Sequence, residues 1–440
     1  MWNRLINGKR FKGCQGIVAD SSTTFYRNSF HKDYDRLIFS NAFRRLSRKT
    51  QVHPLSKNDH VHNRLTHSLE VASVGRSLGL RAGLSLKTHM GADVTEHDVA
   101  YIVQTACLAH DIGNPPFGHA GEEVIKEWFR KSDHSSYLKE LTEQQVFDLQ
   151  KLDGNAQSFR IVTQLENHQF DGGMQLTLPT LGCLVKYPYS SLQAKKDKFN
   201  FFASEQVLFD RIFDEMGLKV SGRYLRHPLS YLMEAADDIC YGMLDILDAA
   251  ELKLISFEDV NSIFSPANSE LDINALYKNG CFDSRRLARM TAMTINRLAE
   301  GVSDVFDKNT EMLLSVDQPK DLIALFENDS GLKQIISQSK SIAREKIFND
   351  RRKIELELGA YNIIETILSC LIPAAFELHQ EKDITSLSFK NRRALELMGE
   401  DKPENDLDLY SMYRRVIDYL VGMTDNYAQF IANQLNGVGE

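Results

Sequence analysis

Apolar and charged residues recur at spacings of three and four through most of this chain, and strand signals are few. Such spacing is typical of amphipathic helices, because it places apolar side chains on one face of a helix. The pattern restricts the chain to an all-α fold class. It predicts helices over Asp35 to Leu46, Arg64 to Leu80, Glu96 to His110, Gly118 to Lys131, Lys151 to Gln164, Glu205 to Met216 and Pro228 to Leu254.

Two regions depart from this periodicity. Residues 1–30 are polar and aromatic and are predicted to form an arm on the surface, and residues 172–200 are rich in Gly, Pro, Tyr and Lys, which indicates a long loop or a short hairpin. A boundary near residue 255 is predicted to divide a catalytic core with its N-terminal arm, 1–255, from a helical C-terminal region, 256–440. Polar breaks in the C-terminal region are expected near 265–270, 305–320, 381–390 and 400–408.

Composition excludes several classes of protein. With 440 residues, 42% hydrophobic residues and a net charge of -8, the chain is an average globular protein rather than one that coats nucleic acid through its overall field, although a local basic groove stays possible. The six cysteines form no CxxC pair, which predicts reduced, mostly buried thiols. Neither a signal-peptide core nor a run of 18 apolar residues is found, so a cytoplasmic protein without a membrane segment is expected.

His110 and Asp111 end an apolar helix just before a turn that contains Gly113 and two prolines. Adjacent side chains on a helix point about 100° apart, but at a helix end both can converge on one ion. A His-Asp pair alone is weak evidence, since such pairs arise by chance. His97-Asp98 is a second pair, at the start of a helix, where Asp98 has a simple capping role beside the predicted N-cap Thr95.

Further residues strengthen this metal hypothesis. His67 lies on a helix whose other face is apolar, where a lone histidine is more often a core residue, and Asp237 and Asp238 interrupt an otherwise apolar helix. Because an unpaired buried carboxylate is costly, a bound cation would explain the acids. His67, His110, Asp111 and one of the acid pair would balance a divalent ion such as Mn, Mg, Co, Fe or Zn and leave two coordination positions for water and a phosphate oxygen.

The order H…HD…D resembles that of the HD metallophosphohydrolases. Over nearly the whole chain the sequence is similar to one branch of them, the dGTP triphosphohydrolase-like proteins. The motifs that carry this resemblance are, in chain order, TQVHPL, NRLTHSLEVA, LAHDIGNPPFGHAGEE, DGNAQSFRI, KYPY, YLMEAADDICYGMLDILDA and GMTDNYA. The resemblance implies an all-α HD-domain core within residues 1–255.

By this resemblance the metal ligands are His67, His110, Asp111 and Asp237. The ion would be manganese, magnesium, cobalt or iron, with zinc or nickel as substitutes in a crystal. The activity implied is hydrolysis of a deoxynucleoside triphosphate at its α-phosphate to deoxynucleoside and tripolyphosphate.

Asp237, Tyr241 and Asp245 stand four residues apart and form one stripe about 12 Å long on their helix. The spacing favours Asp237 over Asp238 as the ligand. The resemblance implies that Tyr241 packs against the deoxyribose and that Asp245 accepts its 3′-OH. Without the stripe, Tyr241 would be taken as a half-buried core aromatic.

His119 and Glu122 share a helix face, so the carboxylate can orient the imidazole for proton transfer, although a histidine and a glutamate at a helix start commonly just face solvent. Asn114 stands where some animal dNTP hydrolases of the superfamily have a histidine, which leaves proton delivery to His119. A triphosphate needs further cations. Arg64, one turn before His67, is the first candidate.

The remaining site residues follow from the resemblance. Lys186 in KYPY is the second phosphate candidate, Gln51 is a candidate base contact, and Asn114 and Asn155 would support the metal ligands. The mixed-charge residues 344–353 and 391–393 are predicted to be solvated helix faces or subunit contacts. A homo-oligomer, often a hexamer in the family, is expected, with single-stranded DNA as a candidate effector.

Two other functions stay open. One is an HD-type nucleotidase acting on deoxynucleoside monophosphates or cyclic nucleotides, and the other is a regulatory protein that binds nucleotide or single-stranded DNA with little turnover. The sequence does not determine the preferred base, which depends on residues 49–53 and the C-terminal part, nor the physiological metal.

Overall fold

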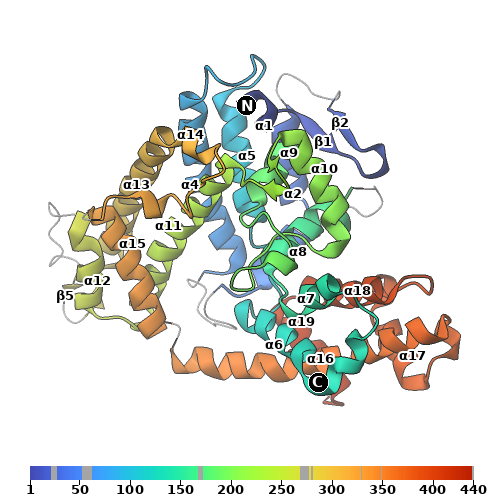
Figure 1. Cartoon of the computed structure of the whole chain (residues 1–440). Helices are drawn as coiled ribbons and strands as arrows, with labels where there is room; N and C mark the ends of the chain where they lie inside the picture. The colour runs from blue at the N-terminus through green and yellow to red at the C-terminus, as the bar shows by residue number, and fades with distance from the viewer. Residues whose placement is uncertain are drawn as a thin grey trace.

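A computed structural model describes residues 1–20, 27–51, 62–166, 172–267, 277–278, 281–328, 330–347 and 349–438. It confirms the all-α fold class: helices form nearly all the regular structure of these residues (Figure 1). The strands pair as antiparallel two-stranded ribbons. They are β1 (Lys9–Phe11) with β2 (Ile17–Ala19), β3 (Lys219–Val220) with β4 (Arg223–Tyr224), and β5 (Tyr277–Lys278) with β6 (Cys281–Phe282).

Part of the predicted surface arm is built into the fold: residues 12–20 are half-buried or exposed, but several of the first eleven residues are buried. Trp2 and Leu5 of helix α1 (Trp2–Leu5) are buried, and the β1 residue Arg10 is completely buried. Arg10 is accommodated because its guanidinium pairs with Asp20, at 2.7 Å, and with Asp33. A charge that is fully paired can lie inside a protein, so the polarity of this segment did not mean exposure.

The first hydrophobic core surrounds helices α4 (Arg64–Ser85), α5 (Glu96–Ala109) and α11 (Pro228–Glu251), which pack on one another. Helices α4 and α5 approach closely because α4 carries glycines at the contact. A Cβ atom at Gly79 would lie 2.9 Å from the Cα of Ala100, and one at Gly83 would lie 2.6 Å from the Cα of Glu96. The first core also includes residues of α2 (Ser29–Ile38), α3 (Asn41–Arg45), α9 (Leu178–Leu184), α10 (Gln206–Met216), α12 (Phe257–Phe264), α13 (Ser284–Lys308), α14 (Thr310–Leu313) and α15 (Gly331–Ile342).

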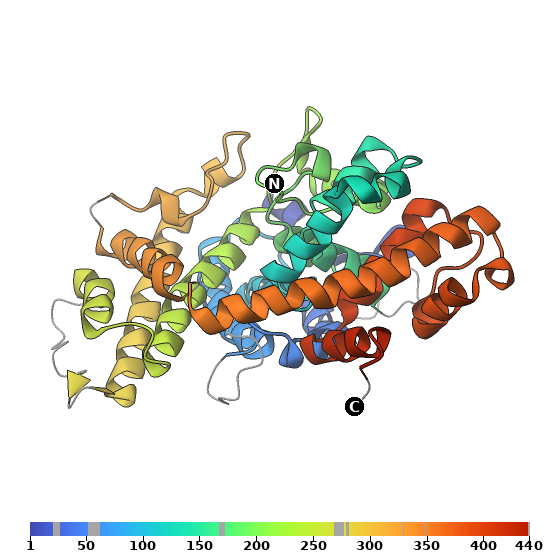
Figure 2. The ribbon, with the colours of Figure 1, turned by 90° about the horizontal axis from the view of Figure 1, so that it is seen from below.

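A second core lies around the long helix α16 (Arg351–Glu381), which contains Pro373 and packs on α6 (Figure 2). Because α12 to α15 share the first core, residue 255 does not separate the two cores, and a domain boundary there stays a prediction. The other helices with residues in the second core are α6 (His119–Arg130), α7 (Glu143–Gln150), α8 (Gly154–Arg160), α17 (Phe389–Leu397), α18 (Leu409–Gly422) and α19 (Asp425–Leu435).

Most of the predicted helices are present, with two corrections. The single helix expected over 35–46 is two helices, because the Ser40 hydroxyl accepts a hydrogen bond from the Phe43 amide and starts α3 anew. The segment 172–200 is not only a loop, since α9 is fully buried within it. The expected cap of α5 is confirmed: Thr95 and Asp98 form a capping box. The predicted break at 265–270 lies partly outside the described residues.

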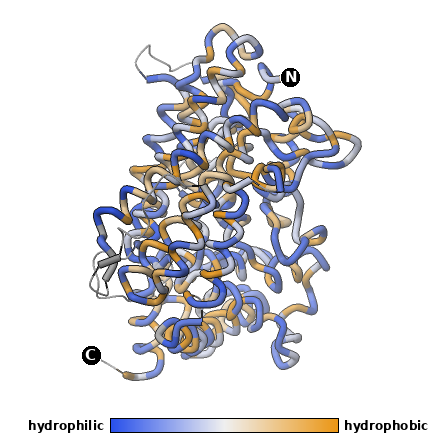
Figure 3. The backbone as a smooth tube through the Cα atoms, turned by 90° about the vertical axis from the view of Figure 1, so that its left-hand side faces the viewer, coloured by the Kyte–Doolittle hydropathy of each residue, from blue (hydrophilic) through white to orange (hydrophobic). Residues whose placement is uncertain are grey.

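Among the described helices, residues 353–381 form the one segment long and apolar enough to cross a membrane by composition alone. Core packing explains this composition, because Ile364, Leu368, Leu371 and Leu378 are completely buried in the second core. Along the helical tubes of Figure 3, hydrophobic and hydrophilic stretches alternate as expected for helices with one buried face.

Candidate metal centre and the pocket beside it

Four side chains from three packed helices meet at one point in the first core. His67 lies on α4, His110 and Asp111 directly follow α5, and Asp237 lies on α11. The Asp237 Oδ1 atom lies 3.2 Å from His67 Nε2 and 3.6 Å from His110 Nε2, which is itself 3.6 Å from Asp111 Oδ1. The structure therefore brings together the four residues that the sequence singled out.

The local chain geometry explains how adjacent residues share this point. The Nδ1 atom of His110 donates to the carbonyl of Cys107, at 2.6 Å, which leaves Nε2 facing the other three side chains. Gly113 then allows a tight turn, because a Cβ there would collide with the Ser158 amide. Asp111 is held from both sides, since its Oδ1 accepts from Asn114 Nδ2 and its Oδ2 from Arg64 Nη1, each at 2.6 Å.

The electrostatics of the cluster favour positive charge at its centre. Burial alone would raise the pKa of Asp111, but Arg64, His110 and His67 hold it at about 2. Burial would likewise lower the pKa of His110, yet Asp111 and Asp237 raise it to about 9. Burial also opposes ionisation of Asp237, whose pKa His110 and His67 keep well below its usual range.

The donor set fits a divalent ion. Ligand atoms at neighbouring positions on an ion with bonds of about 2.1 Å lie about 3 Å apart, close to the separations observed here. The nearest donor atoms of His67, His110 and Asp111 all lie within 4.8 Å of one another. Asp238 is turned away and accepts from Lys340 Nζ at 2.8 Å, so Asp237 alone of the acid pair faces the histidines.

Further along α11, Tyr241 and Asp245 continue the predicted stripe. Tyr241 is half-buried, and Asp245 is buried. Burial and the neighbouring Asp248 carboxylate raise the pKa of Asp245 to about 8. Within the described part of the chain, its buried Oδ2 atom has no hydrogen-bond partner. This end of the stripe thus offers a carboxyl group that can bond a ligand.

His119 and Glu122 form the expected pair at the start of α6. His119 Nδ1 lies 3.1 Å from Glu122 Oε2, with 82% of the histidine side chain exposed and only 2% of the glutamate. Glu122 is anchored, because its Oε1 accepts from the Gly154 amide at 2.8 Å. Burial would raise the pKa of Glu122, but His119 and Lys198 hold it at about 2, so the carboxylate is charged at neutral pH.

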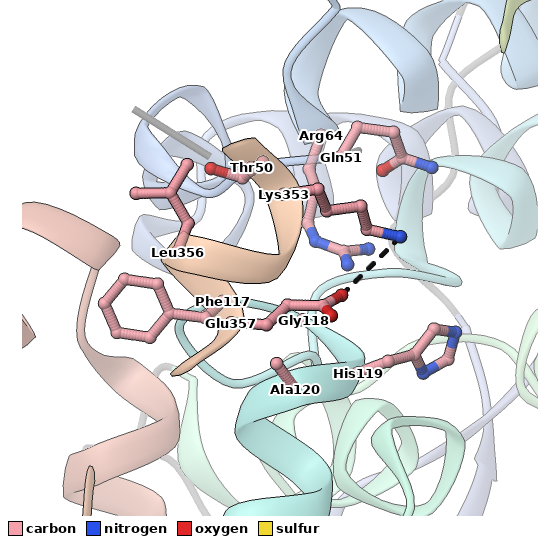
Figure 4. Close-up of a pocket in the computed structure, with 10 residues that line it drawn as sticks. All are labelled: Thr50, Gln51, Arg64, Phe117, Gly118, His119, Ala120, Lys353, Leu356 and Glu357. Atoms are coloured by element: carbon pink, nitrogen blue, oxygen red, sulfur yellow. Dashed lines mark ion pairs between the residues drawn. The ribbon is translucent and has the colours of Figure 1, made fainter. Parts of the chain in front are cut away.

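A pocket opens between the start of α6, residues 50–51 with the first residue of α4, and the first turns of α16 (Figure 4). Gln51 and Arg64 lie in its wall, and the buried Gln51 Oε1 has no hydrogen-bond partner among the described residues. Gly118 lets Arg64 approach, since a Cβ there would lie 2.5 Å from Arg64 Nη2. The lining residues are Thr50, Gln51, Arg64, Phe117, Gly118, His119, Ala120, Lys353, Leu356 and Glu357.

Sequence reasoning missed the contribution of α16 to this pocket. Lys353 and Glu357 form an ion pair, with Lys353 Nζ 3.6 Å from Glu357 Oε1, and both face the pocket (Figure 4). Lys353 ends the segment 344–353 that was expected to be a solvated face or a subunit contact, and Glu357 lies just beyond it. The sequence carries no signal for the pocket here, because charges spaced by four residues are common on any exposed helix.

Lys186 and Asn155 have other partners than the predicted ones. Lys186 Nζ lies 3.0 Å from Glu234, whose other oxygen is 2.5 Å from Arg226, so its charge is already paired next to the metal cluster. Asn155 donates to the Asp153 carboxylate at 2.8 Å and, among the described residues, makes no hydrogen bond with the four cluster residues, whereas Asn114 supports Asp111 as expected. Of the 49–53 segment linked to base choice, residues 52 and 53 lie outside the described residues.

Comparison with known proteins places these observations in a wider context. The family model described as HD domain matches residues 64–196, a range that includes His67, His110 and Asp111. A Pseudomonas aeruginosa protein called deoxyguanosinetriphosphate triphosphohydrolase-like is 43% identical, over 99% of this chain and 98% of its own length. A Synechocystis protein of the same description is 35% identical, covering 99% of both chains. An Enterobacter protein called deoxyguanosinetriphosphate triphosphohydrolase is 30% identical, over 97% of this chain and 96% of its own.

Proposed function

The chain belongs to the family of deoxyguanosinetriphosphate triphosphohydrolase-like proteins with an HD domain, and from this premise we propose that it is a metal-dependent hydrolase of deoxynucleoside triphosphates. Water would cleave the bond between the 5′-oxygen and the α-phosphorus, and the products would be deoxynucleoside and tripolyphosphate. The observation that carries the proposal is the meeting of His67, His110, Asp111 and Asp237 beside a pocket that also holds Arg64 and His119.

His67, His110, Asp111 and Asp237 would hold the divalent ion. When bound, the ion supplies positive charge to the reacting phosphate and favours deprotonation of water. The chain's own contribution is a fixed arrangement of ligands, because Asn114 and Arg64 bind Asp111 and the Cys107 carbonyl orients His110. Preorganisation of this kind avoids rearrangement during the reaction.

Arg64 would bind the triphosphate. Its Nη1 is held by Asp111, and its Nη2 lies against Gly118 at the pocket wall. A guanidinium held in this way presents its remaining N–H groups to phosphate oxygens in a fixed direction. Lys186 stays a candidate for the same role only if phosphate displaces Glu234 from its ammonium group.

His119 would transfer the proton that the leaving 5′-oxygen requires. The Glu122 carboxylate binds Nδ1, so the Nε2 atom is available to substrate on an exposed ring. The carboxylate also fixes the orientation of the ring, as a proton-transfer group requires. Asp245 and Tyr241 would bind the sugar, and Gln51, whose Oε1 lacks a partner among the described residues, would bind the nucleoside.

The experiment that tests the proposal is a panel of the four dNTPs given to metal-loaded protein, with products resolved by ion exchange. Wild type should release tripolyphosphate, and His119→Ala should lose about 10²- to 10⁴-fold in kcat with its metal retained. Monophosphate with pyrophosphate as products would contradict the assigned bond. Preferred cleavage of monophosphates would favour the nucleotidase alternative, and binding without turnover under Mn, Co, Mg and Fe would favour the regulatory one.

Oligomer formation, single-stranded DNA as an effector, and a cytoplasmic location are further proposals that come from the family resemblance. Mass measurement in solution and the rate with added oligonucleotide would test the first two. The mixed charges of α16 and α17 are compatible with subunit contacts.

A further inference from the structure

The GMTDNYA motif near the C-terminus has no part in the mechanism proposed above, yet its aspartate reaches the pocket. Asp425, the first residue of α19, is buried. Its Oδ2 atom accepts hydrogen bonds from the Thr50 amide, at 2.9 Å, and the Thr50 hydroxyl, at 2.6 Å. Its Oδ1 accepts from the Phe117 amide at 2.9 Å. One carboxylate therefore joins two segments that both line the pocket.

The hydrogen bond from the Phe117 amide to Asp425 is made at a strained turn. Phe117 has a φ of 63° and Gly118 a φ of 58°, and His119 follows directly as the first residue of α6. A bulky L-residue in the left-handed region is unfavourable and persists only where surrounding contacts fix it. Asp425 supplies such a contact at the residue where the turn begins.

Lys49 makes a second link between the same parts of the molecule. Its buried Nζ atom donates to the Asn114 carbonyl, at 2.7 Å, and to the Val421 carbonyl at the end of α18, at 2.6 Å. Lys49 also precedes Thr50 and Gln51 in the chain. The side chains of Asp425 and Lys49 thereby bond the junction of α18 and α19 to both walls of the pocket.

We propose that Asp425, assisted by Lys49, is a positioning residue. It sets the separation between Gln51, in one wall of the pocket, and the turn of Phe117 and Gly118 that leads into His119. Neither side chain needs to touch substrate. The C-terminal helices then contribute to turnover by fixing where Gln51, Arg64 and His119 stand relative to one another. The kinetic consequence rests on the proposed function, but the structural link itself does not.

The test compares Asp425→Ala and Asp425→Asn with Asp408→Ala as a matched control. Asp408 caps α18 by accepting from the Ser411 amide at 2.8 Å, and it is remote from the pocket lining. Its loss removes an exposed hydrogen-bonding aspartate from the same group of helices. Hydrogen–deuterium exchange should speed up over residues 49–51 and 114–119 in Asp425→Ala, whereas in Asp408→Ala the change should stay near residues 409–412.

Kinetics at equal metal content and equal folded fraction give the second readout. We expect Asp425→Ala to lose about 100-fold in kcat/KM, through both a lower kcat and a higher KM, because small displacements of catalytic groups have effects of this size. In Asp425→Asn we expect kcat/KM to fall about 10-fold. The amide oxygen can still accept from one of the two segments, but the amide nitrogen cannot accept a hydrogen bond from the other. Thr50→Val, which removes one of the three hydrogen bonds, should lose least.

Unchanged exchange at residues 49–51 and 114–119 in Asp425→Ala, or kinetics equal to those of Asp408→Ala, would overturn the proposal. If Asp425→Ala does not fold, the order of Asp425→Asn and Thr50→Val decides in the same way. A wild-type protein that hydrolyses no dNTP would refute the proposed function alone, because exchange at the two segments still reports whether Asp425 holds them.

Discussion

The metal cluster and the pocket beside it are assembled by different means. The cluster takes its residues from α4, α5 and α11, which pack on one another within the first core, and its four side chains contact each other directly. The pocket takes its walls from both cores, with Lys353 and Glu357 from α16 facing Gln51 and Arg64. The cluster should thus tolerate little change in its own residues, whereas the pocket should respond to changes in residues that only hold its walls.

The sharpest contrast lies within one pair of neighbouring aspartates. Asp237→Asn removes a charge that faces both histidines, so bound metal should be lost and activity should fall about 1,000-fold or more. Asp238→Asn, which alters only a contact with Lys340, should keep its metal. Metal content by mass spectrometry and dNTP turnover measure both. Equal loss in the two variants would remove the distinction between them.

The pocket should be sensitive to a single methyl group at Gly118. In Gly118→Ala the new Cβ would meet Arg64 Nη2, so we expect kcat/KM to fall about 100-fold as the guanidinium shifts. Gly399→Ala is the matched control, because Gly399 also has a positive φ, of 60°, but nothing lies within 4 Å of its Cβ position. Both variants should lose about 1–2 kcal/mol of stability. Normal turnover in Gly118→Ala would contradict the placement of Arg64.

A smaller effect is expected where α16 enters the pocket. Lys353→Met removes a charge that faces the pocket, and we expect KM for the dNTP to rise about 10-fold with little change in kcat. Lys346→Met is a suitable control, since Lys346 pairs with Asp259 at 2.7 Å outside the pocket. Initial rates over a range of substrate concentrations separate the two constants. A KM unchanged by Lys353→Met would exclude α16 from substrate binding.

The smallest effect concerns stability at His62, just before the first turn of α4. Hydrogen bonds to Asp248 and Glu70 raise the pKa of His62 from 6.5 to about 10, so the folded state binds its proton more tightly than the unfolded chain does. This contribution is fully present below pH 6.5 and is lost as the pH rises to about 10. The difference in unfolding free energy between wild type and His62→Gln should therefore shrink between these pH values. If denaturant titrations give the same difference in unfolding free energy at every pH, His62 does not bind its proton more tightly in the folded state.

The chemistry of individual residues made the cluster predictable. A histidine and two acids inside apolar helices need a partner, and that need is visible without any coordinates. The turn at Gly113 and the capping of α5 were likewise encoded locally. The pocket was only partly predictable, because Lys353 and Glu357 look like any charged helix face, and their position depends on how the second core packs against the first. Lys186 shows the same limit, since its partner Glu234 comes from another part of the chain.

The N-terminal segment was misjudged for a related reason. Its polarity suggested exposure, but Arg10 is buried with two carboxylates that only the folded chain brings to it. Asp425 and Lys49 act across still longer separations in sequence, and all but one of the hydrogen bonds described for them end on backbone groups that carry no signature in the sequence.

Pro373 lies inside α16, far along the helix from the end that lines the pocket. From Lys353 to Pro373 the helix rises through 20 residue steps, a length of about 30 Å at the usual rise per residue. Proline is the point at which such a helix bends most easily, since it lacks the amide hydrogen that would close the preceding turn. A bend of about 3° at Pro373 would sweep the Lys353 end through about 1.5 Å, by the proportions of a rod of that length. A small bend at Pro373 would therefore produce a larger displacement at Lys353, which lines the pocket.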